Sequence, residues 1–177
     1  MLISTVKLSQ SLQCHLLTEH FFAGFKAQIN TLDNAASRLP AGIPVVIVTA
    51  SFEGEPADNA AQFVAWISSL KTDGGKGALD GVSYTIFGCG NREWVRTYQR
   101  IPRLIDEKMA EAGADRMMER GEGDAASADF FQKFDEFEDQ MWGVLEKVFL
   151  LPTYLVHGCS SSLCSEIRNW RKGKGGS

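Results

Sequence analysis

The stretch PVVIVTASFEGEPADN, residues 44–59, places a short β-branched run directly before a glycine-containing loop with one aromatic residue, Phe52. The pattern returns in YTIFGCGNREWVRTY, residues 84–98, where the aromatic residue is Trp94. Such continuous apolar runs are typical of strands buried on both faces of a parallel sheet. Open parallel sheets bind their ligands outside the carboxyl ends of the strands. We therefore expect the two loops to form one site for a planar heterocycle.

Composition and charge limit the classes of protein to which the chain can belong. The 177-residue chain has the length of one domain, and 44% hydrophobic with 23% charged residues is ordinary for a globular protein. A net charge of −4 argues against nucleic acid as a partner, because phosphate binding needs a basic face. No apolar run is long enough to span a membrane, and the N-terminus lacks a secretion signal. We expect a cytoplasmic protein.

The four cysteines, Cys14, Cys89, Cys159 and Cys164, show no spacing typical of a metal site or a disulfide framework. Cys89 has no histidine near it in the sequence, so we interpret it as a small buried residue rather than a catalytic thiol. We expect no metal.

Short strands alternate with helices between residues 26 and 149, which predicts an α/β fold with a parallel sheet. Asp58 and Asn59 are expected to cap a helix. The tail after Leu151 is expected to be disordered. The expected strands span residues 26–31, 45–49, 82–87 and 116–119, and the expected helices span residues 60–70, 101–112 and 129–149.

The two loops, TASFEGEPADN and FGCGNREWVRTYQ, resemble the flavin loops of a known family. That family is the FMN-binding, flavodoxin-like domain of diflavin reductases, and the resemblance is closest to the reductase part of self-sufficient cytochrome P-450–reductase fusions. It implies a doubly wound parallel sheet with strand order 2-1-3-4-5. It covers a domain at residues 23–150, between a divergent N-terminus at residues 1–22 and a divergent tail at residues 151–177.

The resemblance also implies the site. Phe52, where the family usually has tyrosine, and Trp94 would stack on the two faces of the isoalloxazine ring of FMN. Backbone groups of residues 89–91 would bind the flavin edge. No catalytic side chain is expected, because the cofactor itself carries the electrons. The implied cofactor-binding residues are Ser51, Phe52, Glu53, Gly54, Cys89, Gly90, Asn91, Trp94, Thr97, Tyr98 and Gln99.

By the same resemblance, the domain would relay single electrons from an FAD/NADPH reductase module to a haem-thiolate monooxygenase of the cytochrome P-450 type. We do not expect the chain alone to oxidise NADPH, because it has no nicotinamide site. The acidic stretch at residues 119–139 has two interpretations. It is either the solvated face of the last helix with its approach loop, or a surface that steers a basic partner.

One part of the family pattern is missing. The family holds the FMN phosphate in a loop rich in Ser, Thr and Gly after the first strand, but residues 1–22 contain no glycine. Residues 1–6 are a candidate substitute strand, and Ser9, Ser11 and Thr18 offer hydroxyl groups. Because the FAD and NADPH domains are absent too, we expect a fragment or a mispredicted gene product.

Two rival hypotheses follow. The chain could be a truncated flavodoxin-like remnant that no longer binds FMN and acts at most as an interaction module. It could also be a regulator of the phospho-receiver type, but residues 45–49 are followed by Ala-Ser rather than by an acidic phosphoacceptor cluster. We prefer the FMN-binding electron carrier.

Overall fold

The structure is a computed structural model that describes residues 2–5, 28–70 and 77–150. For residues 2–5, 149 and 150 it describes only the backbone. The chain divides into two compact units, Met1–Met141 and Trp142–Ser177. The expected tail at residues 151–177, the hydroxyl candidates Ser9, Ser11 and Thr18, and most of the N-terminal segment lie outside the described residues.

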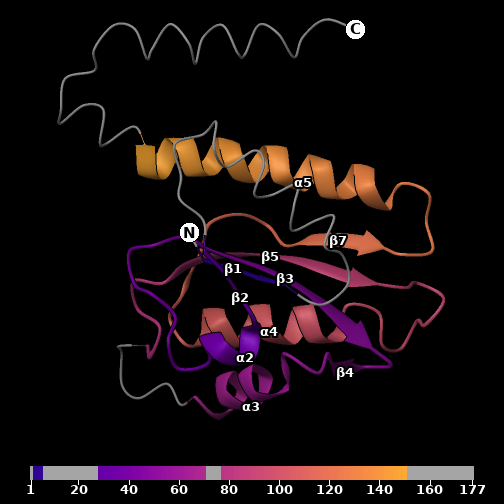
Figure 1. The fold of residues 1–177 in the computed structure, drawn as a ribbon, viewed down its shortest axis with the longest axis horizontal. Helices are drawn as coiled ribbons and strands as arrows, with labels where there is room; N and C mark the ends of the chain where they lie inside the picture. The colour runs from indigo at the N-terminus through magenta and orange to yellow at the C-terminus, as the bar shows by residue number, and fades with distance from the viewer. Residues whose placement is uncertain (1, 6–27, 71–76, 151–177) are drawn as a thin grey trace, which may run out of the picture. The chain divides into compact units, whose positions relative to one another are not determined.

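A parallel sheet is the framework of the first unit (Figure 1). Its strand order, β2-β1-β3-β5-β6, confirms the order 2-1-3-4-5, because β6 and β7 pair in turn with β5 and together form the fifth strand. A short strand, β4, pairs antiparallel with the end of β3. The strands are β1 (Leu2–Thr5), β2 (Gln28–Asn30), β3 (Val45–Phe52), β4 (Glu55–Pro56), β5 (Ser83–Gly90), β6 (Asp115–Arg116) and β7 (Gly121–Asp124).

The candidate substitute strand at residues 1–6 is confirmed for residues 2–5. β1 pairs in parallel with both β2 and β3, and Ile3 lies in register with Ile29 on one side and Val46 on the other. The sheet is therefore continuous from β2 to β3 within the described residues.

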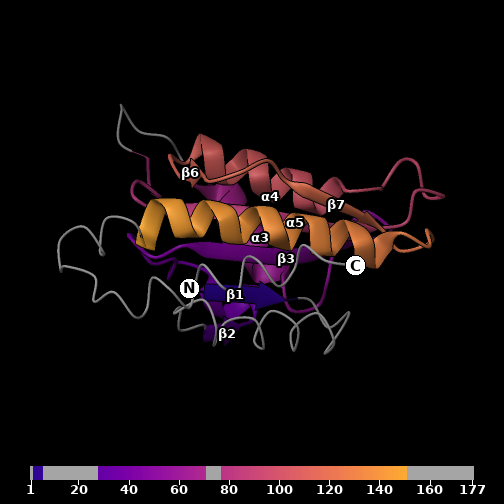
Figure 2. The same cartoon turned by 90° about the horizontal axis from the view of Figure 1, so that it is seen from above.

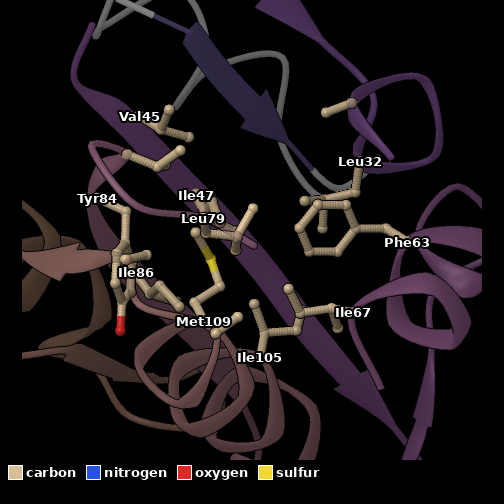
Figure 3. Packing of buried hydrophobic residues seen from close by; sticks show 14 of the residues in the cluster. Leu32, Val45, Ile47, Phe63, Ile67, Leu79, Tyr84, Ile86, Ile105 and Met109 are labelled. Atoms are coloured by element: carbon tan, nitrogen blue, oxygen red, sulfur yellow. The ribbon is translucent and has the colours of Figure 1, made fainter. Parts of the chain in front are cut away.

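One face of the sheet packs against the helices α2 (Leu32–Ala35), α3 (Ala61–Ser69) and α4 (Arg100–Glu111). Alternate residues of β3 and β5 point to this face, as the period of a strand requires. Figure 3 shows these side chains meeting apolar residues of the three helices. The main contributors are Leu32, Val45, Ile47, Phe63, Ile67, Tyr84, Ile86, Ile105 and Met109.

The opposite face carries helix α5 (Phe130–Leu145), whose residues 130–141 belong to the first unit and run along the strands (Figure 2). The β5 residue Phe87 is fully buried here. Its ring centroid lies 6.2 Å from that of Phe130, 5.0 Å from that of Phe134 and 5.2 Å from that of Phe137. These four rings form an aromatic cluster.

The expected strand at residues 116–119 is wrong, since the structure has two short strands, β6 and β7, instead. The sequence GEGD of β7 has low strand propensity. It pairs with β5 because its glycines fit beneath the aromatic cluster. A Cβ on Gly121 would lie 2.5 Å from the Phe87 ring, and one on Gly123 would lie 2.5 Å from the Phe130 ring. Tertiary packing therefore overrides local propensity.

The cap of α3 and the end of the last helix also differ from expectation. The N-cap of α3 is Ala60, not Asp58 or Asn59, and its side chain makes no capping bond. Instead, the Phe63 amide donates to Oδ1 of Asp33, 3.0 Å away and distant in sequence. The last α-helix ends at Leu145 rather than at residue 149, and a π-helical segment, Glu146–Leu150, follows it directly. Over the described residues, no helix is both long and apolar enough to cross a membrane.

Candidate functional site

A cavity of about 490 Å³ lies at the carboxyl ends of β3, β5 and β7, whose arrowheads point to the same edge in Figure 1. Its volume is typical of a small-molecule site. Three chain segments, at or just after the ends of these strands, supply its walls. The lining residues are Ala50, Ser51, Phe52, Cys89, Gly90, Asn91, Trp94, Thr97, Tyr98, Ala125, Ser127, Ala128, Phe130 and Phe131, all uncharged.

The two aromatic residues singled out in the sequence both line this cavity. Phe52 is 56% exposed and Trp94 is 47% exposed, although large rings are usually more deeply buried in a folded domain. They come from separate segments, since Phe52 ends β3 and Trp94 lies in the loop after β5. The cavity therefore offers apolar ring surface to a planar, uncharged group.

The loop after β3 is a tight hairpin. β4 returns antiparallel, with Phe52 in register with Glu55. The turn needs positive φ at Glu53 (49°) and at Gly54 (90°). Gly54 does not line the cavity: a Cβ there would lie 2.8 Å from Cγ2 of Thr97. The lack of a side chain at Gly54 lets the hairpin pack against the second loop, and Gly54 is one of the cofactor-binding residues that the resemblance implies.

The loop after β5 is held by its own backbone. The amides of Thr97 and Tyr98 both donate to the Trp94 carbonyl at 2.9 Å, and the Trp94 amide donates to the Asn91 carbonyl at 3.1 Å. The Arg92 guanidinium lies 5.5 Å from the centre of the Tyr98 ring. These contacts fix the turn that presents Trp94 to the cavity.

Two further expected residues, Glu53 and Gln99, lie outside the cavity lining. Glu53 lines a neighbouring depression together with Glu93 and Trp94. Gln99 is fully buried, and its Nε2 donates to the Gly88 carbonyl at 2.8 Å. Gly88 has no room for a Cβ, which would overlap Gln99 and Pro102. Gln99 thus stabilises the end of β5 through its hydrogen bond to Gly88.

A third wall was missing from the sequence interpretation. Ala125, Ser127, Ala128 and Phe131 follow β7 and line the cavity, whereas the sequence predicts only an acidic stretch and the start of the last helix here. No local signal in the sequence marks this segment, because GEGD has low strand propensity. Only the pairing of β7 with β5 shows that it ends at the same sheet edge. The acidic residues of the stretch 119–139 differ in their exposure to solvent. Asp135, Glu136 and Asp139 are exposed on α5, whereas Glu138 is only 4% exposed.

The polar groups of the cavity fit a heterocycle. The hydroxyl of Ser51 is buried and, within the described part of the chain, has no hydrogen-bond partner. Such a group is costly unless a ligand or water satisfies it. Among the described residues, no group of three or more His, Cys, Asp or Glu side chains is placed to hold a metal ion.

Cys89 lines the cavity but is only 4% exposed, and burial raises its pKa to about 12. A thiolate, not a thiol, is the nucleophile. Cys89 therefore acts here as a small packing residue, in agreement with the interpretation from the sequence.

This raised pKa makes stability depend on pH. The thiol is unionised in the folded protein, whereas in the unfolded chain it ionises above about pH 8.5. Its contribution to stability is therefore complete below pH 8.5 and decreases by about 1.4 kcal/mol per pH unit as the pH rises towards 12. We expect the free energy of unfolding, measured in urea, to fall between pH 8 and pH 10 by about 2 kcal/mol more in the wild type than in Cys89→Ala. An equal fall in both proteins would contradict this assignment.

The sequence matches the family model described as Flavodoxin over residues 13–137. The chain is 49% identical over 126 residues to a self-sufficient cytochrome P-450 monooxygenase from Phanerodontia chrysosporium, covering 71% of this chain and 12% of that protein. It is 51% identical over 119 residues to a bifunctional cytochrome P-450/NADPH–P-450 reductase from Bacillus subtilis, covering 67% of this chain and 11% of that protein. The chain thus spans about an eighth or less of the length of these relatives.

Solved structures agree with this at the level of the fold. A cysteine-to-serine mutant of flavodoxin from Pseudomonas aeruginosa has a TM-score of 0.62 at 18% identity, covering 82% of this chain and 99% of that one. Oxidised flavodoxin 2 from Bacillus cereus has a TM-score of 0.61 at 17% identity, covering 84% and 98%. The family match over residues 13–137, the relatives and the sheet order agree: the chain belongs to the flavodoxin family.

Proposed function

We propose that the cavity binds the isoalloxazine ring of FMN between Phe52 and Trp94, and that the chain is an FMN-binding electron-transfer domain. The observation that carries the proposal is a pair of half-exposed rings, one at the end of β3 and one in the loop after β5, that line one uncharged cavity at the carboxyl edge of the sheet. The uncharged lining suits a neutral tricyclic ring.

The chain's own residues would bind and shield the ring. Stacking on an aromatic side chain is worth about 1–3 kcal/mol per ring by analogy with nucleic-acid bases. The Ser51 hydroxyl and backbone groups of residues 89–91 would hydrogen-bond to its polar edge. FMN supplies the redox chemistry, accepting electrons in pairs and releasing them singly.

The partners belong to the same proposal. The relatives named above are monooxygenases and P-450 reductases. We therefore place this domain between an FAD/NADPH reductase module and a cytochrome P-450-type haem-thiolate monooxygenase. The cytoplasmic location that we propose for it comes from the sequence and not from these relatives. The family's phosphate loop would fall within residues 6–27, outside the described part. The rival hypothesis of a flavin-free remnant is not favoured, because the expected aromatic loops line a cavity of suitable size.

The electron relay can be tested by stopped flow. The full chain, saturated with FMN and reduced with dithionite, is freed of excess reductant and mixed with a ferric cytochrome P-450 haem domain under carbon monoxide. We expect the absorbance band of the ferrous–carbon monoxide complex to appear faster than with the same concentration of free reduced FMN. A rate no higher than that of free FMN would refute the relay.

A further inference from the structure

Asp124 joins two walls of the cavity. Its Oδ1 accepts a hydrogen bond from the Arg92 amide at 3.2 Å and another from the Ala126 amide at 3.1 Å. Arg92 follows Asn91 in the loop after β5, and Ala126 stands between Ala125 and Ser127 in the segment after β7. Asn91, Ala125 and Ser127 all line the cavity. One carboxylate oxygen therefore links segments about thirty residues apart in sequence.

The surrounding backbone bonds support the same junction. The Ala125 amide donates to the Gly90 carbonyl at 2.7 Å, and the Ser127 amide donates to the Asp124 carbonyl at 3.0 Å. Besides the strand pairing of Gly90 with Asp124, the Oδ1 atom of Asp124 supplies a side-chain acceptor that connects the two segments. Hydrogen bonds from backbone amides to a carboxylate are stronger than neutral ones. Without this acceptor, both amides lose their bonded partner.

We infer that Asp124 is a positioning residue, which holds the loop after β5 and the segment after β7 together as one wall of the cavity. It does not line the cavity and acts through the amides of Arg92 and Ala126. The role of the wall in binding FMN rests on the proposed function, whereas the link between the loops can be measured without any ligand.

The experiment uses the full chain and two substitutions with opposite expectations. Asp124→Ala removes the acceptor, while Asp124→Asn keeps an Oδ1 acceptor and removes only the charge. We expect Asp124→Ala to weaken FMN binding about tenfold, roughly the value of one to two hydrogen bonds, and Asp124→Asn to change the Kd by less than about threefold. Asp139→Ala is the matched control, because Asp139 is an exposed carboxylate of the same acidic stretch.

Amide hydrogen exchange, measured residue by residue in the protein without FMN, separates this inference from the proposed function. The Arg92 and Ala126 amides should be protected in the wild type and in Asp124→Asn, and should exchange at least about tenfold faster in Asp124→Ala. If the wild type does not bind FMN, the proposed function fails, and the exchange result still decides the link.

Unchanged exchange at both amides in a folded Asp124→Ala protein would overturn the inference. So would FMN binding that weakens equally in both substitutions while the amides stay protected, since that would make the charge, not the link, responsible. If Asp124→Ala does not fold, the Asp124→Asn protein decides alone. Loss of protection at the Arg92 and Ala126 amides in that protein would contradict the acceptor role of residue 124.

Discussion

Replacing Phe87 with alanine is expected to lower the free energy of unfolding by about 3–5 kcal/mol, the usual cost of truncating a fully buried aromatic ring. Phe87 is 0% exposed and contacts Phe130, Phe134 and Phe137 at centroid distances of 6.2, 5.0 and 5.2 Å. Truncation leaves a cavity bordered by these rings and by β7, which has glycines at this level and no side chains to fill it. Urea unfolding followed by far-UV circular dichroism measures the change.

Phe131→Ala is the matched control in protein free of FMN. Phe131 stands beside Phe130 on α5 but is 60% exposed, so its truncation should cost less than about 1 kcal/mol. A Phe87→Ala protein as stable as Phe131→Ala would contradict the aromatic cluster as the link between β5, β7 and α5.

Replacing Trp94 with alanine is expected to weaken FMN binding about 10- to 100-fold while leaving the stability of the free protein nearly unchanged. The expected loss follows from about 1–3 kcal/mol of stacking on one ring face. The small effect on stability follows from the 47% exposure of Trp94. Titration with FMN, followed through quenching of the flavin fluorescence, gives the Kd.

The neighbouring residue supplies the control. Val95 is 82% exposed and does not line the cavity, so Val95→Ala should bind FMN as the wild type does. Trp94→Phe should recover most of the affinity, because it restores a flat ring. A Trp94→Ala protein that binds FMN as tightly as the wild type would remove Trp94 from the site.

The sequence predicts those parts of the site that are marked by a local pattern of residues. The β-branched run before Phe52 and the glycine-rich turn before Trp94 are local signals, and both loops line the cavity as expected. Gly54 and Gln99 entered the expected set by resemblance alone. The structure places them against Thr97 and Gly88, where they support the loops rather than face the cavity.

The remaining differences come from contacts between residues far apart in sequence. GEGD at residues 121–124 has no local strand signal, and it becomes a strand because its glycines pack under the Phe87 and Phe130 rings. The capping residues expected for α3 differ for a similar reason, since Asp33 rather than a neighbouring residue accepts from the Phe63 amide. Neither contact can be predicted from the local propensities of the residues involved.

The central claim, that FMN binds in this cavity, is tested most directly by recording the ¹H–¹⁵N spectrum of the full chain during addition of FMN. We predict saturable shifts concentrated in three segments, residues 50–52, 89–98 and 125–131, together with the indole N–H of Trp94. These segments contain the residues that line the cavity, and a stacked flavin exerts a strong ring-current effect on nearby protons. Shifts confined to other residues, or no shifts in folded protein, would contradict the assignment of the cavity as the flavin site.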